Sequence, residues 1–147
     1  MKRRSMKARP ILLLQMAVIA AFFAASLLAT DHIVGDSIWT IPPSNDFYSN
    51  WSQNKSFNVG DSLVFRFEMG LYNVVQVSKR EFDSCSAENP FRTILTGPVT
   101  IDLKEEGILY FICSFGNYCL LGQKLFVSVQ RPPPPPPPAK SSSPTSS

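Results

Sequence analysis

Alternation of apolar and polar side chains is the main pattern in the middle of the chain, between Asp31 and Gln130. Three segments alternate in the way typical of half-buried strands: residues 62–68, 99–104 and 124–130. Two further runs, residues 73–78 and 108–113, are more continuously apolar, as expected for strands near the middle of a sandwich. Gly, Asn and Pro residues separate these segments at short intervals. The pattern predicts an all-β sandwich, with helix limited to a turn near residues 80–84.

The two ends of the chain differ in character from this core. Five basic residues precede an apolar run over residues 11–28, and the small residues Ala29 and Thr30 follow it. This order is typical of a secretory signal peptide, so we predict a signal segment over residues 1–29 that is cleaved after Ala29 or Thr30. The length of the run also fits an uncleaved signal anchor.

Seven consecutive prolines, residues 132–138, mark the end of the folded part. Proline cannot supply ladder hydrogen bonds, so the sheet must finish by Arg131. We therefore predict one domain over residues 30–130 and a disordered Pro/Ser-rich tail over residues 131–147. No hydrophobic segment follows the polar spacer, so we expect no C-terminal lipid-anchor signal.

Charge and composition exclude several functions. The formal net charge is +3, but the five basic residues before the apolar run account for more than this excess, so the core is slightly acidic. This balance argues against a nucleic-acid partner. His32 is the only histidine, so nearly every His-dependent catalytic arrangement and every multi-His metal site is excluded. The core also has no Gly-rich phosphate loop. We expect that the protein is not an enzyme.

Secretion would bring the core into an oxidising compartment, where cysteines tend to pair and Asn-X-Ser sequons accept glycans. Asn50 and Asn54 begin two such sequons. Cys85, Cys113 and Cys119 allow three single pairings, each of which leaves one thiol, and their spacing alone does not choose among them.

Several groups of residues follow one another along the core: His32-Ile33-Val34-Gly35 with Trp39, Tyr48-Ser49-Asn50-Trp51, Phe57 with residues 59–65, Cys85, residues 110–113, and Cys119 with residues 122–125. In this order they resemble the plant phytocyanins, the cupredoxin-fold group that includes stellacyanins, uclacyanins and early nodulin-like proteins. The resemblance implies a Greek-key β-sandwich of two sheets. It also implies a disulfide between Cys85 and Cys119, which leaves Cys113 at the position of the copper-binding thiolate. The alternative for Cys113 is a buried cysteine that packs as a small hydrophobe.

A blue-copper centre holds its metal with two imidazoles, one thiolate and a weak axial ligand. By resemblance, the imidazole positions fall at Tyr72 and Tyr118, and the axial position falls at Gln123, as in stellacyanin-type sites. A phenol is protonated at neutral pH and is a poor copper ligand. His32 matches a position in the first strand of the family, where a partly solvated structural histidine is expected. We therefore expect neither copper nor another cofactor.

Two interpretations of the tyrosines remain open at this stage. Tyr72 and Tyr118 can plug the former copper pocket with their rings and leave their hydroxyls at its mouth. Alternatively, together with Phe115 and Trp51, they form an exposed aromatic surface that stacks on sugar rings or packs against a protein.

The function that follows is that of a secreted, glycosylated, copper-free phytocyanin of the early nodulin-like kind, with a binding or structural role. The resemblance implies the plant cell wall or apoplast, or the outer face of the plasma membrane, and a role in carbohydrate handling. The expected partner is a cell-wall glycan or an extracellular protein. The alternatives are a type 1 blue-copper electron-transfer protein, with copper on Cys113 and Gln123 and unusual oxygen ligands, and a carrier of small apolar or sugar ligands.

Overall fold

The computed structural model describes residue 10, residues 29–134 and residues 136–138. Most of the predicted signal segment, and the tail from residue 139 onward, lie outside the described residues. The described elements follow in the order β1 (Asp31–Ile33), the 3-10 helix η1 (Val34–Asp36), α2 (Phe47–Gln53), β2 (Phe57–Asn58), β3 (Ser62–Phe65), β4 (Val74–Val77), α3 (Lys79–Ser84), β5 (Arg92–Ile94), β6 (Val99–Asp102), β7 (Gly107–Ile112) and β8 (Lys124–Gln130). None of the helices in this part of the chain is long and apolar enough to cross a membrane.

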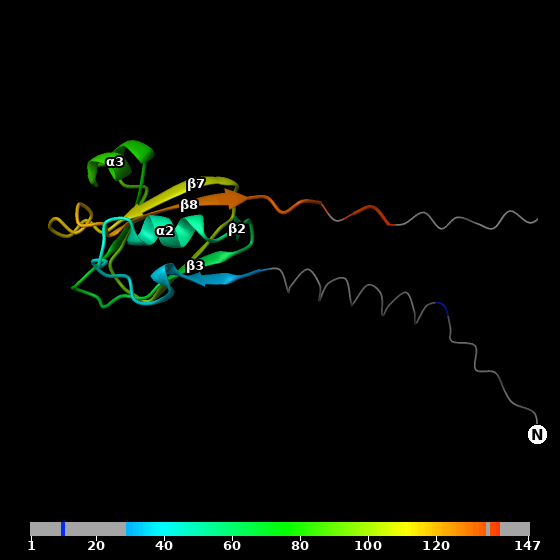
Figure 1. Cartoon of the computed structure of the whole chain (residues 1–147), viewed down its shortest axis with the longest axis horizontal. Helices are drawn as coiled ribbons and strands as arrows, with labels where there is room; N and C mark the ends of the chain where they lie inside the picture. Colours follow the sequence, from blue (N-terminus) through cyan, green and yellow to red (C-terminus); the bar gives the residue numbers. More distant parts are fainter. Residues whose placement is uncertain (1–9, 11–28, 135, 139–147) are drawn as a thin grey trace, which may run out of the picture.

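The strands form two sheets that face each other across the core (Figure 1). One sheet has the order β1-β3-β6, and the other has the order β2-β8-β7-β4-β5. β1 runs parallel to β3 and β2 runs parallel to β8, whereas the other pairs are antiparallel. The two continuously apolar runs become β4 and β7, which lie inside the larger sheet as the sequence predicts. β8 ends at Gln130, immediately before the proline run.

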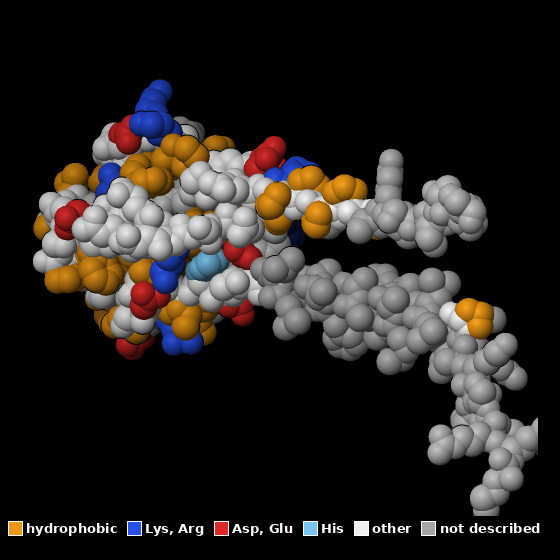
Figure 2. Space-filling view, turned by 45° about the vertical axis from the view of Figure 1, so that its right-hand side comes forward, with side chains coloured by type: hydrophobic (Ala, Val, Ile, Leu, Met, Phe, Trp, Pro, Cys, Tyr) orange, Lys and Arg blue, Asp and Glu red, His pale blue; other side chains and the backbone are white. Residues whose placement is uncertain are grey.

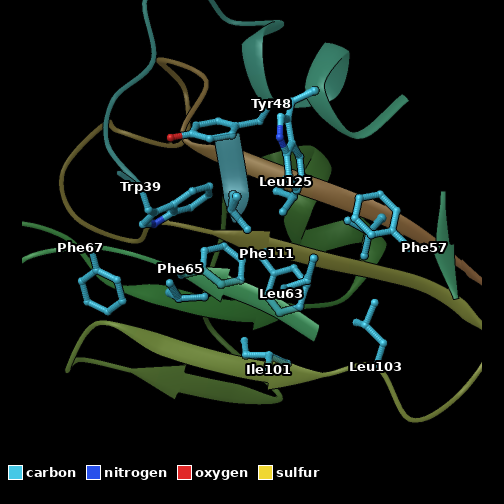
Figure 3. Packing of buried hydrophobic residues seen from close by; sticks show 14 of the residues in the cluster. Trp39, Tyr48, Phe57, Leu63, Phe65, Phe67, Ile101, Leu103, Phe111 and Leu125 are labelled. Atoms are coloured by element: carbon cyan, nitrogen blue, oxygen red, sulfur yellow. The ribbon is translucent and has the colours of Figure 1, made fainter. Parts of the chain in front are cut away.

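Aromatic side chains fill the space between the sheets (Figure 3). Trp39 and Phe65 are fully buried, and their rings meet edge to face with centroids 5.1 Å apart. Phe65 also packs on Phe111 from the opposite sheet, with a centroid distance of 5.3 Å. Burial of a large apolar side chain contributes roughly 1.5–3 kcal/mol, so these contacts hold the two layers together. The alternation in the strands places the apolar side chains on this inner surface.

Helix α2 corrects the expectation that helix is limited to residues 80–84. Its buried side chains, Tyr48, Trp51 and Ser52, are three and four residues apart and so lie on one helical face. The helix was missed because its Ser and Asn residues have low intrinsic helix propensity, and tertiary packing of the aromatic face overrides that preference. Strand β3 is also shorter than predicted. It ends at Phe65, and the next carbonyl, that of Arg66, accepts a hydrogen bond from the Trp39 backbone N–H at 2.7 Å.

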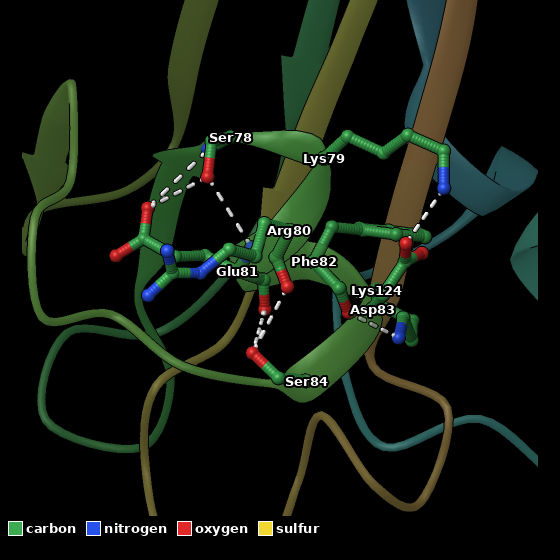
Figure 4. Close-up of polar contacts among 8 residues, drawn as sticks. All are labelled: Ser78, Lys79, Arg80, Glu81, Phe82, Asp83, Ser84 and Lys124. Atoms are coloured by element: carbon green, nitrogen blue, oxygen red, sulfur yellow. Dashed lines mark hydrogen bonds and ion pairs between the residues drawn. The ribbon is translucent and has the colours of Figure 1, made fainter.

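Helix α3 confirms the predicted helical turn and is fixed at both ends (Figure 4). At its start, the Ser78 hydroxyl accepts from the Glu81 backbone N–H while the Glu81 carboxylate accepts from the Ser78 N–H, which forms a capping box. Near its end, the Lys124 ammonium donates to the Phe82 carbonyl at 2.5 Å. Cys85 follows in the left-handed conformation, with φ of 51°. The helix therefore presents Cys85 toward the loop before β8.

Candidate functional site

The residues at the predicted copper positions come from two loops that meet at one end of the sandwich. Tyr72 lies two residues before β4, whereas Cys113 follows β7 and Gln123 precedes β8. The Cys113 backbone N–H donates to the Gln123 carbonyl at 3.0 Å, and the Gln123 N–H donates to the Tyr118 carbonyl at 3.0 Å. These bonds close the loop from residue 113 to residue 123 and fix Tyr118 beside Gln123.

The two tyrosines form a pair at this end. Their ring centroids are 5.9 Å apart and their planes are tilted by 55°. Both side chains are partly buried and pack against the main core cluster, as does Phe115. The tyrosines therefore have one part in the core and one part at the surface. The buried part of each ring agrees with the interpretation as a plug, and the exposed part agrees with the interpretation as an aromatic surface.

A chain of hydrogen bonds through Thr40 and Tyr48 holds the Tyr72 hydroxyl in place. The Thr40 hydroxyl donates to the Tyr72 hydroxyl oxygen at 2.8 Å. Thr40 is held in turn by Tyr48, whose hydroxyl donates to the Thr40 carbonyl at 3.0 Å and accepts from the Thr40 N–H at 3.1 Å. Burial raises the pKa of Tyr48 to about 12, so this phenol stays neutral. Sequence reasoning did not identify Thr40, because nothing in its local pattern points to Tyr72.

A second support joins the two loops directly. The Asn73 amide donates to the Ser114 hydroxyl at 2.8 Å, and the Ser114 backbone N–H donates to the Asn73 side-chain oxygen at 2.9 Å. The Trp39 indole N–H donates to the Asn73 carbonyl at 2.9 Å. This bridge therefore links the residues that directly follow Tyr72 and Cys113 in the sequence. Asn73 and Ser114 were also missed by sequence reasoning, since they are 41 positions apart.

Cys113 and Gln123 are both completely buried. Cys113 carries a free thiol, and burial raises its pKa, which disfavours the thiolate that copper requires. Within the described residues, neither polar atom of the Gln123 carboxamide has a hydrogen-bond partner. A buried amide without partners is costly and is uncommon in folded proteins. Among the four residues at the predicted copper positions, Gln123 is therefore the one whose buried side-chain polar atoms lack hydrogen bonds in the described structure.

The donor set does not fit a blue-copper ion. Such a site needs two imidazoles in addition to a thiolate, whereas this site offers two phenols, a protonated thiol and an amide. His32 is engaged elsewhere, since its Nε2 lies 2.9 Å from Oδ2 of Asp61 and its ring packs on Phe57. Among the residues that the structure describes, no three His, Cys, Asp or Glu side chains gather closely enough to hold a metal ion.

Trp51 does not join the aromatic surface that the sequence suggested. Its side chain is 8% exposed and packs on Phe57 with centroids 5.7 Å apart. The error has a simple cause, because position in the sequence does not show on which side of α2 an aromatic ring is buried. The exposed hydrophobic residues nearest to the tyrosines in the sequence are instead aliphatic, namely Leu71, Leu120 and Leu121.

The remaining predicted site residues occupy other parts of the molecule. Cys85 and Cys119 form the disulfide that the resemblance implies, with Cα atoms 5.7 Å apart. Asn50 lies in α2 and Asn54 caps its C-terminal end, and both side chains are exposed. Their exposure is compatible with glycosylation, which stays a prediction.

A two-sheet sandwich with a disulfide between Cys85 and Cys119 and a free, buried Cys113 has the architecture expected of the cupredoxin class. The plastocyanin-like domain family matches residues 39–123. The chain is 40% identical over 113 residues to the "Blue copper protein" of Arabidopsis thaliana, covering 76% of this chain and 58% of that protein. It is 35% identical over 125 residues to "Early nodulin-like protein 14" of the same plant, covering 81% of this chain and 68% of that protein. The chain belongs to the plant phytocyanin family.

A solved structure supports the same assignment. Cucumber stellacyanin, determined with Cu²⁺, superimposes with a TM-score of 0.64 and 42% sequence identity. The match covers 70% of this chain and 96% of that protein. The predicted Greek-key, cupredoxin-like sandwich is therefore confirmed for the described core.

Proposed function

We propose that this protein is an extracellular phytocyanin that works without copper and binds a partner at the end of the sandwich that carries Tyr72 and Tyr118. The observation that supports this proposal is the tyrosine pair, with ring centroids 5.9 Å apart, at both positions where imidazoles would be required. Its role is binding or structural, and it is not an enzyme. Its place is the apoplast or the outer face of the plasma membrane.

The surface around the tyrosine pair supports a binding role. Hydrophobic side chains are exposed at the end of the sandwich opposite the start of β1 and the end of β8 (Figure 2). Beside Tyr72 lies a groove of about 670 Å³, whose apolar walls include Ile38, Met69, Leu71 and Pro98. Half-exposed phenols suit contacts that are apolar on one side and hydrogen-bonded on the other. The chemistry fits a cell-wall glycan or the surface of an extracellular protein.

The first experiment tests the absence of copper. Purified protein is mixed with Cu(II), and the intense visible band of thiolate-to-copper charge transfer is recorded. We expect no such band for the natural sequence and a strong band for the double variant Tyr72→His, Tyr118→His, because that variant restores the imidazoles. Addition of Cys113→Ser should abolish the new band. A strong band from the natural sequence that Cys113→Ser removes would overturn the copper-free proposal.

The second experiment tests binding. The protein is applied to an array of plant cell-wall glycans and to a library of extracellular plant proteins, and Tyr118→Ala is compared with the control Phe91→Ala. Phe91 is an exposed aromatic residue next to β5, 71% accessible, outside the tyrosine surface. We expect Tyr118→Ala to lose binding and Phe91→Ala to retain it. Equal binding by both variants would contradict a role for the tyrosine surface.

A type 1 copper electron-transfer function is the second candidate. Cys113 is free and buried, and both polar atoms of the Gln123 side chain lack a partner within the described part of the chain. Both side chains could therefore act as ligands of a metal ion. The relatives named blue copper proteins also favour it. It requires copper to bind without imidazoles, so the Cu(II) experiment decides between the two candidates.

A further inference from the structure

The carboxylate of Asp61, a buried residue between β2 and β3, contacts the residues at which the folded core begins. Its side chain is only 3% exposed. Oδ2 lies 2.9 Å from Nε2 of His32, and because a carboxylate only accepts hydrogen bonds, this nitrogen carries the proton. Oδ2 also accepts from the Asn58 backbone N–H at 3.0 Å. The other oxygen, Oδ1, accepts from the Thr30 backbone N–H at 3.0 Å.

Thr30 is thus the first residue that the sandwich holds by its backbone within the described part of the chain. Besides the bond from its N–H to Asp61, its carbonyl accepts from the Ser62 N–H at 2.9 Å. Strand β1 begins at the next residue and pairs with β3 from Asp31 opposite Ser62. Ala29 is exposed. Among the described residues, the boundary at which backbone bonding to the core begins is therefore the Ala29–Thr30 peptide bond.

This boundary coincides with one of the two cleavage positions expected for the signal segment. We infer that a signal peptidase cleaves the Ala29–Thr30 bond, and that the new α-ammonium of Thr30 forms an ion pair with the Asp61 carboxylate that docks the mature N-terminus onto the core. In the cleavage, water adds across the amide and the C–N bond breaks. Ala29 leaves as a carboxylate, and Thr30 keeps its nitrogen as an ammonium group. This inference rests on the secretion that forms part of the proposed function.

The folded core accommodates a terminus created at this bond better than a terminus created one residue later. Hydrolysis before Thr30 leaves its nitrogen in place, 3.0 Å from Oδ1 of Asp61, and converts a neutral donor into a charged one. Charge-assisted hydrogen bonds are roughly twice as strong as neutral ones. Cleavage after Thr30 would remove both the donor to Asp61 and the acceptor for Ser62. It would leave Oδ1, on a nearly buried side chain, without that partner.

The charged groups near the new terminus also favour the pair. Asp61 faces the nitrogen directly, and the neighbouring Asp31 is exposed. His32 engages the opposite oxygen of the same carboxylate. A negative charge at this distance favours the protonated amine, and a protonated amine is not nucleophilic. The chemical reactivity of the α-amine therefore reports whether the ion pair exists.

The test begins with the full-length chain secreted from a plant host. Mass spectrometry of the mature protein should give Thr30 as the first residue, and any other first residue would overturn the inference. The α-amine is then labelled with an amine-reactive ester at neutral pH. Since one unit of pKa changes the reactive fraction tenfold, we expect labelling to be about tenfold slower in the natural sequence than in Asp61→Asn. The control Asp31→Asn, which removes a neighbouring exposed carboxylate, should label at the natural rate.

A second pair of proteins keeps the test decisive if Asp61→Asn is not secreted. The chain is produced behind a removable leader that is cut before Thr30 or before Ala29. The Ala29 form places its amine one residue further from Asp61, about 3.8 Å along the chain, so it should label about tenfold faster. Equal labelling of the two forms would overturn the ion pair. Neither form touches the tyrosine surface, so failure of the copper-free or binding proposal leaves this result unchanged.

Discussion

The bridge between Asn73 and Ser114 joins the two loops that carry Tyr72 and Cys113. Asn73, which is 2% exposed, donates one of its two hydrogen bonds, at 2.8 Å, and accepts the other, at 2.9 Å. Asn73→Ala removes both bonds at once. Because Ser114 keeps its backbone N–H after the substitution, that group must find another partner or remain unsatisfied.

The expected loss can be worked out from these contacts. A hydrogen bond within a protein contributes roughly 1 kcal/mol net, so the two bonds account for about 2 kcal/mol. Truncation of the buried Asn73 side chain also removes packing, which brings the expected loss to about 2–4 kcal/mol in the free energy of unfolding. Ser114→Ala removes only the hydroxyl acceptor and should cost about 1 kcal/mol.

Urea unfolding followed by tryptophan fluorescence is a suitable assay, because Trp39 is fully buried and donates to the Asn73 carbonyl. For a domain of this size, each kcal/mol also lowers the melting temperature by roughly 4–8 °C. Asn117→Ala, at an exposed position in the same loop as Ser114, is the matched control and should change stability by less than about 0.5 kcal/mol.

The combination of Asn73→Ala with Ser114→Ala separates the bridge from other effects. If the bridge carries the loss, the two substitutions together should cost less than the sum of the single ones, with a coupling of about 1 kcal/mol. Strict additivity would show that Asn73 and Ser114 act independently. An Asn73→Ala variant no less stable than Asn117→Ala would refute the argument altogether.

Two further predictions concern the rest of the core. Replacement of Cys85 and Cys119 by Ala opens a loop with a sequence separation of 34, for which chain entropy gives a loss of about 4 kcal/mol in urea unfolding; a loss below about 1 kcal/mol would contradict it. Burial alone would raise the pKa of Asp61, but hydrogen bonds from His32 and two backbone N–H groups outweigh it and lower the pKa below its usual value. A lowered folded pKa adds stability that is lost as pH falls below about 3.8. Melting temperatures should therefore fall more steeply on acidification for the natural sequence than for Asp61→Asn, and parallel curves would exclude this linkage.

The strands were predictable because alternation is a local property. In β6, Val99 and Ile101 face inward while Thr100 and Asp102 are exposed, so four residues suffice to show a half-buried strand. Helix α2 was not predictable on the same basis. Only three of its seven side chains are buried, and they are buried because β8 and η1 pack against the helix. That information lies in distant parts of the chain.

The candidate site was likewise predictable only in part. The resemblance to phytocyanins located Tyr72, Cys113, Tyr118 and Gln123, and the structure brings their loops together through backbone hydrogen bonds. It did not locate the polar side chains that support them. Thr40 and Tyr72 are 32 positions apart, and no local pattern marks a threonine as the partner of a phenol.

The frame of this site and its ligand chemistry are separable. The bond from Cys113 N–H to the Gln123 carbonyl is made by the backbone, so it does not depend on which side chain stands at position 118. A phenol ring at positions 72 and 118 packs against the core, and it adds a hydroxyl that Thr40 satisfies at Tyr72. Loss of both imidazoles therefore need not cost the fold its loops. The same backbone frame can therefore carry different side chains at positions 72 and 118 without a change in the hydrogen bonds that close the loop.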